Sequence, residues 1–282
     1  MHWVPLVASL VAAVAITPTT VRGLREQGLV RDNYRGARVA FPTGIALLVP
    51  AFVALIVVGP VYQFANSSPL VDGSDLAVFF VLGVAVLGLI DDFAGSRAGQ
   101  PRGWRGHFGA LARGHLSTGV LKAVGVLGLA LYLVASPIDP AYSAADYLLT
   151  AAVLVLATNV FNLLDLRPGR AIKALVLLGA GLAAGSGRVA PLQAVSLFLG
   201  PILVLLPLDL REAGMLGDTG SNVIGAVAGV WLVLTLTTTL GLAIAAGVLV
   251  LITLYGEFRS ISAFVERTPG LRQLDLLGRS HA

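Results

Sequence analysis

The chain has no cysteine and few charged residues. Asp, Glu, Lys and Arg make up 12% of its 282 residues, against roughly 25% in an average soluble domain. Without cysteine, disulfides, thiolate metal sites and cysteine nucleophiles are excluded. The four histidines do not follow a metal-ligand spacing such as HExxH. They are His2, His107, His115 and His281.

Apolar residues are abundant instead. They make up 56% of the chain, and the mean hydropathy is +0.87. Apolar stretches near or above the roughly 20 residues that cross a bilayer recur along the whole length. We therefore predict an all-α, polytopic integral membrane protein with about nine transmembrane helices. It forms a single membrane domain over residues 1–282, of which 256–282 form a cytoplasmic or interfacial tail.

The predicted spans are Val4–Val21, Phe41–Val61, Leu76–Ile90, Ser117–Ala135, Ala145–Leu164, Ala171–Gly185, Pro191–Leu208, Asn222–Thr237 and Thr239–Tyr255. The boundary between the last two is inferred from length, because only a cluster of threonines interrupts the apolar run. A tight turn at these threonines is the prediction, and one very long tilted helix is the alternative.

The basic residues predict the orientation. With the amino terminus outside, every Lys and Arg except Arg188 falls on the cytoplasmic side, as the positive-inside rule requires. We therefore expect a multi-pass plasma membrane protein. Its net charge of +4 then reflects topology, so no nucleic-acid partner is expected. Arginine-rich cytoplasmic loops attract phosphorylated lipids and nucleotides.

Four aspartates lie where an apolar segment meets a polar loop on the predicted cytoplasmic side. They are Asp91 and Asp92 in GLIDDF, Asp165 in NVFNLLD and Asp218 in MLGDTGSN. A carboxylate beside hydrocarbon costs about 2.5 to 3.5 kcal/mol, so four converging carboxylates call for a counter-charge. A divalent metal ion is the natural candidate.

Adjacent residues of a helix point about 100° apart, so Asp91 and Asp92 can reach one cleft but seldom chelate one ion together. One would bind metal while the other acts as a base or orients a phosphate. The alternative is that both simply end the third span and are solvated. For Asp218, an N-cap at the start of a helix is the corresponding alternative.

Asn159, Asn162 and Asp165 are spaced i, i+3 and i+6, which predicts roughly one helical face. Two amides and a carboxylate suit a planar, hydrogen-bonding ligand such as a base or an N-acetyl sugar. Polar contacts between helices are the alternative. The loop from Asp91 to about Leu116 is rich in glycine and arginine, which suits phosphate oxygens.

The order GLIDD, NxxNxxD and LGDTGS resembles that of the polyprenyl-phosphate hexosamine-1-phosphate transferases. This family includes phospho-N-acetylmuramoyl-pentapeptide transferase and the bacterial transferases that move N-acetylglucosamine 1-phosphate onto undecaprenyl phosphate. The resemblance covers about Val21 to Gly229. The segments NYRGARVAFPTGI and LSTGVLKAVG also resemble segments of the family, and the chain would be a divergent member.

The resemblance implies the transfer of a sugar 1-phosphate from a UDP-sugar to a polyprenyl phosphate, with release of UMP, for cell-envelope glycan synthesis. Asp91, Asp92 and Asp218 match the catalytic aspartates, and Asp218 with Asp91 is the expected site for Mg²⁺ or Mn²⁺. Residues matching the nucleotide-sugar site are Asn159, Asn162 and Asp165. A homodimer is implied by the resemblance alone.

The chain departs from the family at three places. Gly95 replaces the lysine three residues after the paired aspartates, with Arg97 nearby. LRPGRAIKA replaces DGLDGLA, and the histidine motif of the last cytoplasmic loop and the tenth span have no counterpart. We expect Arg167 and Arg170 to replace the lost contacts.

Two alternatives remain from the sequence. One is a catalytically degenerate member that binds the lipid phosphate or the nucleotide without turnover. The other is a lipid or solute transporter, which the position of the acids at one face and the lack of an internal repeat disfavour.

Overall fold

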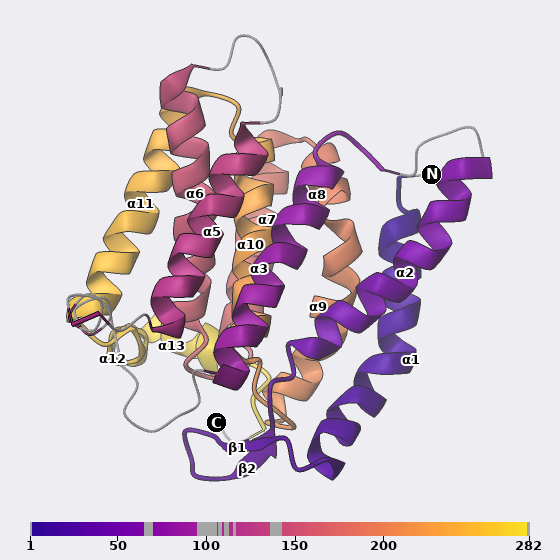
Figure 1. Ribbon diagram of the computed structural model, residues 1–282. Helices are drawn as coiled ribbons and strands as arrows, with labels where there is room; N and C mark the ends of the chain where they lie inside the picture. Colours follow the sequence, from indigo (N-terminus) through magenta and orange to yellow (C-terminus); the bar gives the residue numbers. More distant parts are fainter. Residues whose placement is uncertain are drawn as a thin grey trace.

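The computed structural model describes residues 2–64, 70–94, 106, 109, 113–114, 117–135 and 143–280. Within them the chain is a helical bundle with one two-stranded sheet, so the all-α prediction is confirmed (Figure 1). The helices are α1 (Val4–Glu26), α2 (Ile45–Phe64), α3 (Ser74–Ala94), α5 (Thr118–Val134), α6 (Ala144–Leu164), α7 (Arg170–Ser186), α8 (Ala190–Ala194), α9 (Ser196–Leu210), α10 (Gly217–Thr235), α11 (Thr239–Phe258), α12 (Ile261–Arg267) and α13 (Pro269–Leu276).

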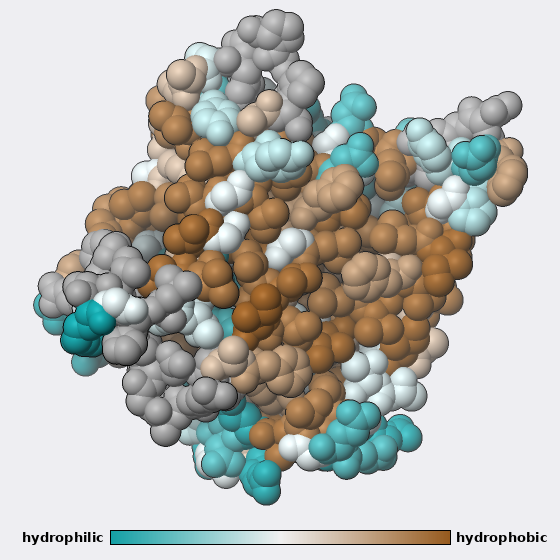
Figure 2. All heavy atoms as spheres, viewed as in Figure 1, coloured by the Kyte–Doolittle hydropathy of each residue, from teal (hydrophilic) through white to brown (hydrophobic). Residues whose placement is uncertain are grey.

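Within the described ranges, five helices are long and apolar enough to cross a membrane, namely α1, α2, α3, α6 and α11. Two further apolar helices, α5 and α9, are shorter. On the face seen in Figure 2, hydrophobic residues cover the middle of the bundle and hydrophilic residues gather toward its two ends. The architecture is that of an all-α membrane protein.

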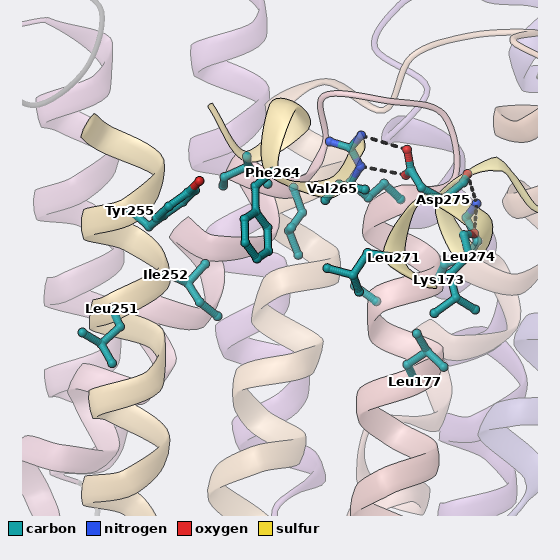
Figure 3. Close-up of a pocket in the computed structure, with 14 residues that line it drawn as sticks. Lys173, Leu177, Leu251, Ile252, Tyr255, Phe264, Val265, Leu271, Leu274 and Asp275 are labelled. Carbon is teal, nitrogen blue, oxygen red and sulfur yellow. Dashed lines mark hydrogen bonds and ion pairs between the residues drawn. The ribbon is translucent and has the colours of Figure 1, made fainter. Parts of the chain in front are cut away.

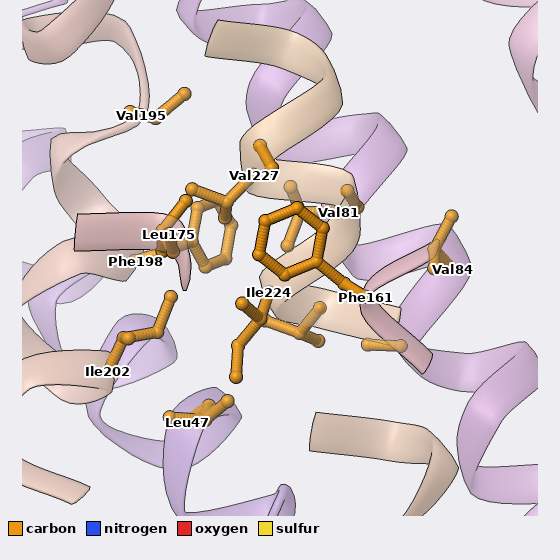
Figure 4. Close-up of a cluster of buried hydrophobic side chains, with 14 of the residues drawn as sticks. Leu47, Val81, Val84, Phe161, Leu175, Val195, Phe198, Ile202, Ile224 and Val227 are labelled. Carbon is orange, nitrogen blue, oxygen red and sulfur yellow. The ribbon is translucent and has the colours of Figure 1, made fainter. Parts of the chain in front are cut away.

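Helix α10 lies at the centre of the bundle and packs against α6, α3 and α7 (Figure 1). Its residues from Thr219 to Leu232 are all buried. The core around it combines large side chains from several helices, among them Leu47, Phe161 and Phe198 (Figure 4). A small residue brings α10 close to α6, because a Cβ at Gly225 would lie 2.7 Å from the Cα of Thr158.

The predicted turn between the last two spans is confirmed. Helix α10 ends at Thr235, and α11 begins at Thr239. The side chain of Thr238 caps α11 by accepting a hydrogen bond of 3.1 Å from the Gly241 amide. One continuous helix is therefore excluded, because the threonines that interrupt the apolar run supply the cap.

The sheet was not predicted. Strands β1 (Val30–Asp32) and β2 (Arg38–Ala40) form an antiparallel hairpin with Val30 opposite Ala40. Residues just before α10 add to it, since the Met215 amide donates to the Ala40 carbonyl at 2.9 Å and the Thr43 amide donates to the Met215 carbonyl at 2.8 Å. The hairpin therefore holds the approach to α10 beside the start of α2.

Candidate active site

Asp91, at the end of α3, belongs to a cluster of three charged groups. The Nζ atom of Lys122 lies 2.8 Å from Oδ2 of Asp91 and 3.1 Å from Oδ2 of Asp218. Three helices, α3, α5 and α10, therefore bring one cation between two carboxylates. Lys122 was not predicted as a site residue, although a lone cation near the start of an apolar span is a signal that could have found it.

Asp92 faces the backbone at the start of α10 and is only 5% exposed. Its Oδ1 accepts a 2.8 Å hydrogen bond from the Asp218 amide. Its Oδ2 accepts from the Thr219 amide at 2.8 Å and from Thr219 Oγ1 at 2.6 Å. The first amides of a helix lack partners within the helix, so Asp92 supplies from α3 the cap that α10 lacks in its own sequence.

A polar cavity of about 270 Å³ lies next to these groups. It brings together four of the predicted residues, which are Asp92, Asn162, Asp165 and Asp218. Asn162 is fixed by a 3.0 Å hydrogen bond that its Oδ1 accepts from Ser221 Oγ on α10. The rest of the lining comes from the segment 31–41, the loop 166–168 and the segment 209–217.

Asn159 lies apart from this cavity. Its Nδ2 donates a 3.3 Å hydrogen bond to Oγ1 of Thr253 on α11. The prediction of one face for all three residues is therefore wrong for Asn159. Six steps of 100° leave the first and last residues about 120° apart. Asn159 makes the polar contact between helices that was the alternative interpretation.

Carboxylates crowd the cavity. Burial and the charges of Asp209, Asp218 and Asp92 raise the pKa of Asp165 well above its ordinary range. Asp209 is buried as well, and its Oδ2 accepts a 2.7 Å hydrogen bond from the Gly169 amide. A cation bound among these groups would reduce their mutual repulsion.

Among the described residues, no group of three or more His, Cys, Asp or Glu side chains could hold a metal ion by itself. Asp91 and Asp218 nevertheless lie close enough to share one cation, which is Lys122 here. Mg²⁺ is usually bound by one or two carboxylates together with substrate phosphates. The pair therefore fits an ion that completes its coordination with a phosphate.

Two arginines line the cavity and lie over aromatic rings. The guanidinium of Arg167 lies 4.6 Å from the ring centre of Tyr34, and that of Arg31 lies 3.7 Å from the ring centre of Phe41. Cation–π contacts of this kind restrict the position of a guanidinium. Arg167 also pairs with Glu266 at 3.5 Å and donates to the Leu166 carbonyl at 3.0 Å. Both residues are well placed to meet an anion in the cavity.

Arg170 does not face the cavity, so its predicted role in substrate binding is wrong. Its Nε and Nη2 donate to the two carboxylate oxygens of Asp275 at 2.8 and 3.0 Å, the pair of dashed lines at Asp275 in Figure 3. Its Nη1 donates to Oγ of Ser262 at 3.0 Å. Arg170 and Asp275 are 6% and 7% exposed. Helices α12 and α13 fold back onto α7 and supply this carboxylate. Only Arg167 of the two remains at the cavity.

The same tail makes further contacts with the loop beside the cavity. Nζ of Lys173 donates to the carbonyls of Leu274, Asp275 and Leu277 at the end of α13. Nε of Arg279 donates to the Pro168 carbonyl at 3.1 Å. A second, apolar cavity of about 430 Å³ lies between α7, α11 and the tail and shares no lining residue with the polar one (Figure 3).

The glycine- and arginine-rich loop lies almost wholly outside the described residues, as do Gly95, Arg97, His107, His115 and His281. No protein-family model matches the chain, and no curated protein matches it.

Proposed function

We propose that the protein transfers a sugar 1-phosphate from a UDP-sugar to a polyprenyl phosphate at the cytoplasmic face of the plasma membrane, releasing UMP. The observation that carries the proposal is the position of Lys122 between Asp91 and Asp218, beside a cavity that contains Asn162 and Asp165. The resemblance of the three motifs to the polyprenyl-phosphate hexosamine-1-phosphate transferases supports it.

Each group has a task in this reaction. Asp91 and Asp218 would hold Mg²⁺ or Mn²⁺, which when bound neutralises phosphate charge and orients the pyrophosphate. Lys122 contacts both of these carboxylates, and it would offset the charge of the same phosphates as the β-phosphorus is attacked. Asn162 and Asp165 would bind the nucleotide sugar, and Arg31 and Arg167 would meet its phosphates.

A membrane-surface site suits two substrates of which one is a lipid and the other is soluble. We propose nine spans with the amino terminus outside. In support of this orientation, α1 begins at the end of the bundle away from the β1–β2 hairpin (Figure 1). The segment just before α10 pairs with the hairpin, since the Met215 amide donates to the Ala40 carbonyl, so α10 begins at the hairpin end. The basic loops would then surround the cavity on the cytoplasmic side.

The test is UMP release by the purified full chain with undecaprenyl phosphate, Mg²⁺ and a panel of UDP-sugars. Asp91→Asn, Asp218→Asn and Lys122→Met should each abolish lipid-dependent release. Asp75→Asn is the matched control, because Asp75 is an exposed carboxylate in the first turn of α3, at the other end of the helix from Asp91. Release that persists in Asp218→Asn, or that needs no lipid phosphate, would reject the proposal.

One observation favours a second candidate, a protein that binds these ligands without turnover. The Lys122 ammonium already lies between the two carboxylates that would hold the metal and offsets part of their charge. Binding of undecaprenyl phosphate or UDP-sugar, with no UMP release from any donor, would support this second candidate.

A further inference from the structure

We infer that Asp92 is a positioning residue, which fixes the first turn of α10 so that Asp218 meets Asp91, rather than a base or a metal ligand. Asp92 was predicted as a catalytic residue, and its role is instead to hold the start of α10. This role rests on the proposed function only where turnover is measured, and the unfolding measurements below do not depend on it.

The hydrogen bonds of Asp92 leave little capacity for chemistry. Its two oxygens accept three hydrogen bonds from Asp218 and Thr219. As a base, Asp92 would take up a proton and present a donor to groups that are themselves donors. Protonation would leave the two amides fewer acceptor sites and would force the Thr219 hydroxyl to change from donor to acceptor, so the base role competes with the capping role. Although Asp92 borders the polar cavity, only 5% of the residue is exposed.

The surrounding backbone is shaped to receive this carboxylate. Gly217 has a φ of +71°, and a Cβ there would lie 2.7 and 2.8 Å from the two oxygens of Asp92. Gly88 precedes Asp92 by four residues and so lies on the same face of α3. A Cβ at Gly88 would lie 2.6 Å from the Asp218 carbonyl oxygen. One face of α3 thus provides both the close approach and the cap for α10.

Asp91 lies about 100° around the helix from Asp92 and pairs with Lys122 on α5. The two adjacent aspartates therefore serve two different neighbours of α3. Because Asp92 binds the amides of Asp218 and Thr219, it sets where the Asp218 carboxylate lies relative to Asp91. Loss of the cap should therefore weaken the binding of any ion that needs the carboxylates of both Asp91 and Asp218.

The experiment compares Asp92→Asn, Thr219→Val and the double variant in the purified full chain. We measure the thermal unfolding midpoint and the Mg²⁺ concentration that gives half-maximal turnover. Both single variants should lower the midpoint, and the double variant should lower it by less than their sum, because they remove the same cap. The half-saturating Mg²⁺ concentration should rise several-fold in each.

Ile224→Val is the matched control, since Ile224 is fully buried in α10 away from the cap. It should lower the midpoint without changing the Mg²⁺ requirement, which separates positioning from general destabilisation. An Asp92→Asn protein that unfolds like the parent but has no turnover would overturn the inference. If the parent itself releases no UMP, the proposed function fails. The cap is still tested in that case, because a double variant whose midpoint falls by the full sum of the two single changes would reject it. If Asp92→Asn does not fold, Thr219→Val alone decides, because a catalytic base would not need that hydroxyl.

Discussion

Asp275→Asn should release the C-terminal tail from the bundle. The Arg170–Asp275 pair is buried, and Asp275 also accepts a 2.6 Å hydrogen bond from Nη2 of Arg279. Removing one partner of a buried ion pair costs about 3–5 kcal/mol, because the other charge is left uncompensated. The tail can relieve this cost by undocking, so the loss appears as release of α12 and α13 rather than as global unfolding. A loss of about 3 kcal/mol changes the ratio of docked to undocked tails by about two powers of ten.

Limited trypsin digestion of the purified full chain measures this release, because Arg267 and Arg272 are exposed on the tail. Cleavage should be about a hundredfold faster in Asp275→Asn than in the parent if cleavage follows the undocked population. Arg170→Met combined with Asp275→Leu should cleave more slowly than Asp275→Asn, since it leaves no unpaired charge at position 170.

Glu266→Gln is the control for surface charge, because Glu266 forms a 3.5 Å ion pair with Arg167 and is more than half exposed. Exposed pairs of this kind contribute about 0–1 kcal/mol, so its cleavage rate should stay close to that of the parent. Equal cleavage rates in Asp275→Asn and the parent would refute the assignment of the ion pair as the anchor of the tail.

Three further predictions follow from the geometry. Burial tends to raise the pKa of Asp275, but its hydrogen bond to Arg170 and the charges of Arg170, Arg279 and Lys173 outweigh burial and lower it. The contribution of Asp275 to docking is therefore complete above the unfolded pKa of about 3.9 and is lost as the pH falls through the lowered folded pKa. The protection of the α13 amides from hydrogen exchange, relative to the intrinsic exchange rate at each pH, should be unchanged from pH 7 to pH 5 and should fall only in acid below that. Gly217→Ala should lower both the unfolding midpoint and turnover, because the added Cβ meets the Asp92 carboxylate and the φ of +71° disfavours a side chain; an unchanged midpoint would contradict it. Asn162→Leu should raise the KM for the UDP-sugar while Asn159→Leu should not, and the reverse result in steady-state kinetics would move the sugar site toward α11.

The predicted spans located the helices well where long apolar runs decide them, but the start of α10 was missed. The sequence predicted a span from Asn222, because the preceding residues from Gly217 to Ser221 are polar and typical of a turn. They are helical because Asp92, more than a hundred residues away, accepts hydrogen bonds from the first amides. A cap supplied by a distant helix leaves no local signal at the helix that it caps.

The β1–β2 hairpin shows a similar limit. Each strand has three residues, and charged side chains occupy Arg31, Asp32 and Arg38. Such short strands carry no periodicity that could distinguish them from a basic loop. Their pairing with the segment before α10 depends on contacts between residues far apart in sequence, as at Ala40 and Gly214.

The different contacts of Asp91 and Asp92 have a local signal in the sequence of α3. Both were predicted as catalytic because both match the paired aspartates of the family that the chain resembles. Leu87 precedes Asp91 by four residues, however, and Gly88 precedes Asp92 by four residues. A glycine on one face of a membrane helix marks where another backbone approaches closely, and Gly88 does lie against the first turn of α10. Leu87 lies on the other face, where a Cβ at Gly125 of α5 would meet its side chain at 2.7 Å. Because residues four apart share a helix face, Asp92 lies on the face of Gly88 and binds the backbone of α10. Asp91 lies on the face of Leu87 and pairs with Lys122 of α5.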